Sequence, residues 1–188
     1  MNQRSIVYIA VFGTLWGFAE ATLGNVLHLL HLPLSGSILS AIGLVIILIA
    51  RVYNPVRGST LLMSIIAASI KILSFATVKV GPFVAIIMEG FLIEIVLIIT
   101  GPKRLGFLLS GVIMALYPLI QNIVVKSILF GSSFVPVILD LAKGFSEQMG
   151  YAAGWWILGL YIFAHLAIGL GAAYFSWILK KRLTAKTK

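Results

Sequence analysis

The sequence predicts an all-α integral membrane protein, and three observations lead to this fold class. Of its 188 residues, 61% are hydrophobic and 10% are charged, whereas soluble domains average about 45–50% apolar and about 25% charged residues. The apolar residues gather in six segments that approach the roughly 20 residues needed to cross a bilayer as a helix. Turn-forming residues separate most of these segments. We therefore expect one domain over residues 1–188, a compact bundle of six transmembrane helices.

The six spans follow one another with short connections, except before the last. Leu32-Pro33-Leu34-Ser35-Gly36 precedes the second span, Asn54-Pro55 the third, Gly81-Pro82 the fourth and Gly101-Pro102 the fifth. The longer connection 127–150 places Asp140, Lys143 and Glu147 on one face of a short helix, which is typical of a helix lying at the membrane surface. The predicted spans are 5–28, 36–51, 59–77, 82–100, 105–126 and 151–179.

The distribution of Lys and Arg predicts that the N and C termini are both cytoplasmic. Cytoplasmic segments of membrane proteins carry an excess of basic residues. With this orientation, the outer loops hold only Lys79 and Lys143, and the inner segments hold ten of the 14 basic residues: Arg4, Arg51, Arg57, Lys103, Arg104, Lys180, Lys181, Arg182, Lys186 and Lys188. This bias also explains the net charge of +9, so we expect a multi-pass protein of the cell membrane and no nucleic-acid partner.

Several polar residues fall inside the predicted spans, where burial is costly and function is the usual explanation. Helix rise puts Glu20 about 22 Å and Lys71 about 18 Å from the inner ends of their spans, and Glu89 about 10 Å from the outer end of its span. Tyr117, Gln121 and Asn122 lie at a similar outer depth, about 18–25 Å up the fifth span. Glu94 and His165 lie nearer the middle, and the inner halves are otherwise expected to be apolar.

This shared depth allows two interpretations. Lys71 would lower its burial cost by pairing with Glu89 or Glu20, and such ion pairs could simply hold the bundle together. Alternatively, the cluster forms an outward-facing pocket for a small solute. The gathering of polar residues toward one leaflet favours the pocket, since a purely structural network does not require it.

The first span carries a ridge of small residues. Gly13, Gly17 and Ala21 are spaced by four and allow another helix to approach closely. Packing within the chain and docking onto a different subunit both explain this ridge, and the sequence leaves the choice open.

Histidines and tryptophans near the outer membrane surface provide further candidates. His28 and His31 flank the first outer turn, but no third ligand of suitable spacing lies nearby, so we expect no metal site. Trp155, with Trp156, either belongs to an interfacial aromatic belt or turns inward to stack on a flat ligand.

The architecture resembles the S components, the substrate-binding membrane subunits of energy-coupling-factor (ECF) transporters. The resemblance covers the whole chain as architecture. At residue level it lies in Ala10-Val-Phe-Gly13-Thr-Leu-Trp-Gly17, in Arg57-Gly58-Ser59 and in Gly81-Pro82-Phe-Val-Ala-Ile-Ile-Met-Glu89-Gly90.

The resemblance implies a function, partners and site residues. S components capture a vitamin, a vitamin precursor or a metal ion near the outer surface, beneath loops that follow the first and third spans. This places Asn25, His28 and His31 in one lid region and Lys79 in the other. Metal-binding members begin with a histidine after the initiator methionine, whereas this chain has Asn2, which favours an organic solute.

The resemblance also implies that the first helix docks, through an AxxxA patch, on a transmembrane coupling subunit that works with two ATPase subunits. Here Gly13, Gly17 and Ala21 occupy that patch. The chain has no GxxxxGK[ST] loop, so we expect ATP to be used by the partner subunits and no cofactor in this chain. The residues expected to bind substrate are Glu20, Asn25, His28, Lys71, Glu89, Tyr117, Gln121, Asn122 and Trp155.

Other small transporters or channels are one alternative to this transporter subunit, and two further classes of protein are also alternatives. An intramembrane enzyme would have to draw an acid–base pair from Glu20, Glu89 or Glu94, and the sequence contains neither GxSxG nor HExxH. We therefore expect no catalytic residue. A structural or assembly subunit without a ligand is the second alternative.

Overall fold

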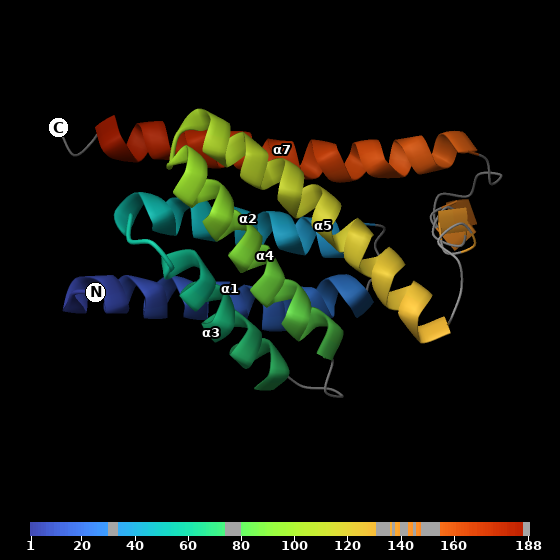
Figure 1. The fold of residues 1–188 in the computed structure, drawn as a ribbon, viewed down its shortest axis with the longest axis horizontal. Coiled ribbons are helices and arrows are strands. Elements are labelled where there is room, and N and C mark those ends of the chain that lie inside the picture. The colour runs from blue at the N-terminus through green and yellow to red at the C-terminus, as the bar shows by residue number, and fades with distance from the viewer. Residues whose placement is uncertain are drawn as a thin grey trace.

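The computed structural model describes residues 1–29, 34–73, 80–130 and 155–185, together with 136, 138, 139, 143, 144, 146 and 147. The short surface helix expected around 140–147, with His31 and Lys79, falls largely or wholly outside the described residues. Six helices are defined within them, and no strand occurs there (Figure 1). These helices are α1 (Gln3–Leu29), α2 (Ser35–Tyr53), α3 (Ser59–Leu73), α4 (Val80–Thr100), α5 (Arg104–Phe130) and α7 (Trp155–Ala185).

The helices match the predicted spans closely, although α5 continues past 126 to Phe130 and α7 past 179 to Ala185. Five of them, all but α3, are long and apolar enough to cross a membrane. The described part of α3 has 15 residues, which corresponds to about 22 Å against a hydrocarbon core of about 30 Å. Residues 74–77, the end of the predicted third span, lie outside the described residues, as do 151–154 before α7.

The helices form a closed ring of contacts. In order around the ring, α1 packs on α3, α3 on α4, α4 on α5, α5 on α7, α7 on α2, and α2 again on α1. The second helix, α2, also contacts α5 across the bundle. In Figure 1, α1, α2 and α7 run roughly parallel to the long axis, whereas α3, α4 and α5 cross them obliquely.

The contact between α1 and α3 is formed at the glycine ridge. A Cβ atom added at Gly13 would lie 3.0 Å from Cβ of Ile66, and one at Gly17 would lie 2.8 Å from Cβ of Ile70 and 3.0 Å from Cα of Ala67. Packing within the chain therefore accounts for both glycines. A docking role for Gly13 and Gly17 would require α3 to move away from α1. Ala21, one turn further on, is half-buried.

The centre of the bundle is filled where α1 meets α2. The indole ring of Trp16 is fully buried, and a Cβ atom at Gly43 would lie 2.9 Å from its Cε2 atom. Leu44, Ile47 and Leu48 continue this core along α2. The indole ring of Trp16 fills the space that the absence of a side chain at Gly43 leaves, and this fit fixes the register of α1 against α2.

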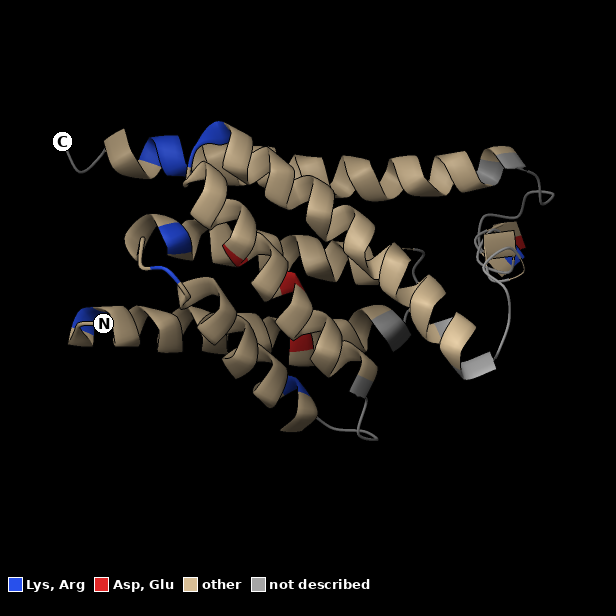
Figure 2. Cartoon of the chain, in the orientation of Figure 1, with Lys and Arg blue, Asp and Glu red and all other residues tan. Residues whose placement is uncertain are grey.

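The outer surface of the bundle is apolar. Phe18 is 63% exposed, Ile99 77% and Phe163 68%. Soluble monomers rarely expose contiguous apolar surface on this scale, so the described helices are those of a membrane bundle. Basic residues instead gather at the end of the molecule that holds both termini, where α2 and α7 finish and α5 begins (Figure 2).

Candidate functional site

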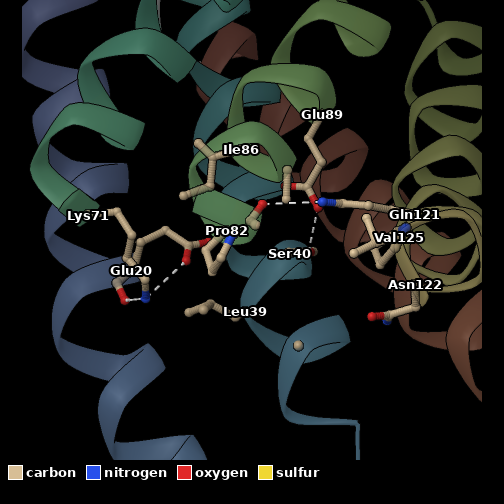
Figure 3. Close-up of a pocket in the computed structure, with 14 residues that line it drawn as sticks. Glu20, Leu39, Ser40, Lys71, Pro82, Ile86, Glu89, Gln121, Asn122 and Val125 are labelled. Carbon is tan, nitrogen blue, oxygen red and sulfur yellow. Dashed lines mark hydrogen bonds and ion pairs between the residues drawn. The ribbon is translucent and has the colours of Figure 1, made fainter. Parts of the chain in front are cut away.

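Five helices enclose a polar cavity in the half of the bundle away from the termini. Its volume is about 310 Å³, near the lower end of the roughly 300–1,000 Å³ typical of ligand pockets. Its rim is exposed at Gly36 and Gly81, which lie at the beginnings of α2 and α4, and at Asn122 of α5. The polar side chains that line it are Glu20, Ser40, Lys71, Glu89, Gln121 and Asn122 (Figure 3).

Lys71 pairs with Glu20 across the contact between α3 and α1. Its Nζ atom lies 3.6 Å from Oε2 of Glu20, and it also donates a hydrogen bond to the main-chain carbonyl of Glu20. Gly24, one turn along α1, leaves the space for this ammonium group, since a Cβ atom there would lie 2.6 Å from Nζ. The sequence allowed Lys71 to pair with Glu20 or with Glu89, and in the structure it pairs with Glu20.

Glu89 lies in the cavity and forms no ion pair with any of the described residues. The residue is 4% exposed, and its Oε1 atom accepts a hydrogen bond of 2.8 Å from the hydroxyl of Ser40 on α2. Glu20, which has the same sign, acts on it electrostatically. In Figure 3, Glu89 lies between the Glu20–Lys71 pair on one side and Gln121 on the other.

The fifth helix closes the remaining side of the cavity. Gln121 donates a hydrogen bond of 3.2 Å to the carbonyl of Gly81 at the beginning of α4, and Asn122 follows it at the exposed rim. Pro118, within α5, also lines the wall. Tyr117 is half-buried and does not line the cavity, although it lies close enough to Glu89 to interact with it electrostatically.

Five of the nine predicted binding residues line this cavity, namely Glu20, Lys71, Glu89, Gln121 and Asn122. Asn25 is exposed on α1 and does not line it. The side chains of His28 and Trp155 lie outside the described residues. Ser40 was missed from the sequence because a lone serine in an apolar helix usually bonds to its own backbone, so nothing in its spacing indicates a partner on α4.

A second buried polar cluster lies nearer the termini and corrects an expectation from the sequence. Arg51, the last residue of the predicted second span, lies on α2 and is 3% exposed. Its Nη2 atom is 3.0 Å from Oε1 of Glu94, and its Nη1 atom donates to Oγ of Ser59 at 2.7 Å. The inner half of the bundle is therefore not uniformly apolar.

Glu94 also caps the beginning of α3. Its Oε1 accepts the main-chain N–H of Gly58 at 2.7 Å, and its Oε2 accepts that of Thr60 at 2.9 Å. The first N–H groups of a helix have no partners within the helix, so a carboxylate at this position satisfies them. Gly58 adopts φ +83° there, which favours glycine. We define the Arg51–Glu94 cluster as Arg51, Ser59 and Glu94.

The chain matches no family model, no curated protein and no solved structure. The described residues contain no group of three or more His, Asp or Glu side chains suited to hold a metal ion. The chemistry of the cavity therefore has to be deduced from its own geometry. It offers one ion pair, one further carboxylate, two amides and an apolar wall formed by residues such as Leu39 and Ile86.

Proposed function

We propose that this protein is the solute-binding membrane subunit of an importer of the ECF type, an S component that captures a small organic solute from outside the cell. The observation that carries the proposal is the cavity itself. It is open at one end of the bundle, lined by polar side chains from five helices, three of them buried (Glu20, Ser40 and Glu89), and large enough for a small molecule. Sites of this kind, apolar with a few convergent polar groups, are the usual form of ligand pockets.

The two polar clusters support binding over a purely structural role for the cavity. In the Arg51–Glu94 cluster, both carboxylate oxygens of Glu94 accept hydrogen bonds from the protein. In the cavity, Glu89 receives a single hydrogen bond from Ser40 and borders open space. A residue that served only to hold helices together would gain more from the first arrangement, because buried charges are stabilised by saturated hydrogen bonding.

The topology that we propose has six spans and cytoplasmic termini. Basic residues gather at the end with the termini, as the positive-inside rule requires of a cytoplasmic face (Figure 2). The rim at Gly36, Gly81 and Asn122 then opens outward. The sequence has no nucleotide-binding loop, so the proposal assigns the supply of energy to a coupling subunit and two ATPase subunits in the cell membrane.

Gentle purification followed by mass spectrometry tests the binding step. We expect a small molecule to accompany the purified protein, and Glu89→Gln to lose it. Glu147→Gln is the matched control, because it makes the same chemical change at an exposed residue that does not line the cavity. Purified protein that carries no small molecule and is stabilised by none would contradict a solute-binding function.

Reconstitution into liposomes tests the coupling step. The bound solute should enter the vesicles only when the coupling subunit, the ATPases and internal ATP are all present. Uptake that proceeds with this chain alone would identify an autonomous transporter. Chemical conversion of the solute by this chain alone would identify an enzyme.

A further inference from the structure

The charges that line the cavity do not cancel. The described lining holds two carboxylates, Glu20 and Glu89, and one ammonium group, Lys71. Lys71 is held at Glu20 through both the carboxylate and the main-chain carbonyl. With each group in its usual ionised form, the cavity carries a net charge of −1, and Glu89 is its source.

No other basic side chain of the described residues is placed to neutralise Glu89. Arg51 is occupied at Glu94 and Ser59 in the other cluster. Lys180 binds the carbonyl of Pro102 and lies against the ring of Trp177, at the end of the bundle with the termini. Among the described residues, Glu89 therefore has no cationic partner.

We infer that the solute is a small organic cation with a single positive charge, such as a protonated amine, whose nitrogen pairs with Glu89. This inference rests on the proposed solute-binding function and specifies its substrate class. A charge at membrane depth is costly without a partner, and a ligand cation would remove that cost on binding. The amides of Gln121 and Asn122 are placed to bind polar groups at the other end of the molecule, and Leu39 and Ile86 to contact its apolar part.

The same geometry disfavours two other classes of ligand. An anion would have to approach two carboxylates with a single ammonium group that is already paired. A metal ion generally requires three or more protein ligands, whereas Glu89 is the one lining carboxylate without a cationic partner. A neutral solute would fit the cavity if Glu89 bound a proton, and this is an outcome of the experiment.

Two measurements on the intact purified chain test the inference. The first is the charge of any molecule that accompanies the protein, determined by mass spectrometry. The second is thermal stabilisation by three probes of similar size, which are benzylamine as the cation, benzamide as the neutral molecule and benzoate as the anion. We expect benzylamine to stabilise the protein best. Glu89→Gln should weaken benzylamine binding by about 10-fold or more, the usual loss for a charge-assisted contact, and Glu147→Gln should not.

The outcomes separate this inference from the proposed function. A co-purified cation, or preferential stabilisation by benzylamine that depends on Glu89, supports both. A co-purified anion or neutral molecule, or a preference for benzoate or benzamide, overturns the cation while the solute-binding function stands. Cation binding that is unchanged in Glu89→Gln also overturns the inference. If no molecule co-purifies and no probe binds, the solute-binding function fails and the inference fails with it.

Discussion

The two buried polar clusters use the same residue types in opposite ways. Both contain a glutamate from α4, and the two glutamates lie five residues apart. Glu94 meets a guanidinium group and two main-chain N–H groups, so its charge and hydrogen bonds are satisfied within the fold. Glu89 meets one hydroxyl group beside an open cavity. Burial alone therefore does not distinguish a structural carboxylate from a binding one; the number of internal partners does.

The largest effect should follow from Glu94→Gln. The substitution removes the ion pair and leaves the buried Arg51 guanidinium without its anion, a change that typically costs about 3–5 kcal/mol. Thermal unfolding in detergent should show a large loss of stability. The double variant Arg51→Met/Glu94→Leu should be less damaging than Glu94→Gln, since it leaves no unpaired charge. If the melting temperature of Glu94→Gln were unchanged, Glu94 would not be a structural carboxylate, and the contrast with Glu89 would fail.

Gly17→Leu should affect the cavity more than the Arg51–Glu94 cluster. The new side chain meets Ile70 and Ala67, and overpacking of this kind costs about 1–3 kcal/mol. Because α1 carries Glu20 and α3 carries Lys71, separation of the two helices should also weaken their ion pair and ligand binding.

The control for this variant is Gly171→Leu on α7, where an added Cβ atom meets nothing within 4 Å. It should retain stability and binding. If Gly17→Leu retained both while preventing assembly with a coupling subunit, the ridge would serve docking and not packing within the chain.

Glu89→Gln makes the same chemical change as Glu94→Gln, but we expect it to weaken ligand binding and to leave stability nearly unchanged. Ligand affinity should fall by about 10-fold, while the melting temperature of the ligand-free protein should change little or rise, because a buried charge without a cationic partner is removed. Ligand titration and unfolding of the same preparation measure both quantities. A stability loss as large as that of Glu94→Gln would make Glu89 structural.

Gly24→Ala should reduce stability less than Gly17→Leu does. The added methyl group displaces the flexible end of Lys71, with Leu39 Cδ2 at 3.0 Å as its other neighbour, so the free energy of unfolding should fall by about 1 kcal/mol, the lower end of the usual cost of overpacking. Ligand affinity should nevertheless change, because Lys71 has to leave its position beside Glu20. If Gly24→Ala bound the ligand as tightly as the natural protein, the Glu20–Lys71 ion pair would not contribute to ligand binding.

The helices could be predicted well, and the partners of individual side chains less well. Long apolar runs determine where helices form, and helix rise was enough to place Glu20, Lys71 and Glu89 at one depth. The sequence did not determine which side of α1 would face α3, so the partner of Gly17 remained open. The burial of Arg51 and its pairing with Glu94 were not predicted, because a count of basic residues indicates the side of the membrane and not the contacts of a side chain.

The cap that Glu94 provides to α3 has a consequence for biosynthesis. A chain inserted from its N-terminus delivers α3 to the membrane before residue 94 has been synthesised. Until then, the N–H groups of Gly58 and Thr60 and the guanidinium group of Arg51 lack the carboxylate that satisfies them. We therefore expect α3 to enter the bilayer stably only together with α4, as a helical hairpin released from the translocon in one step.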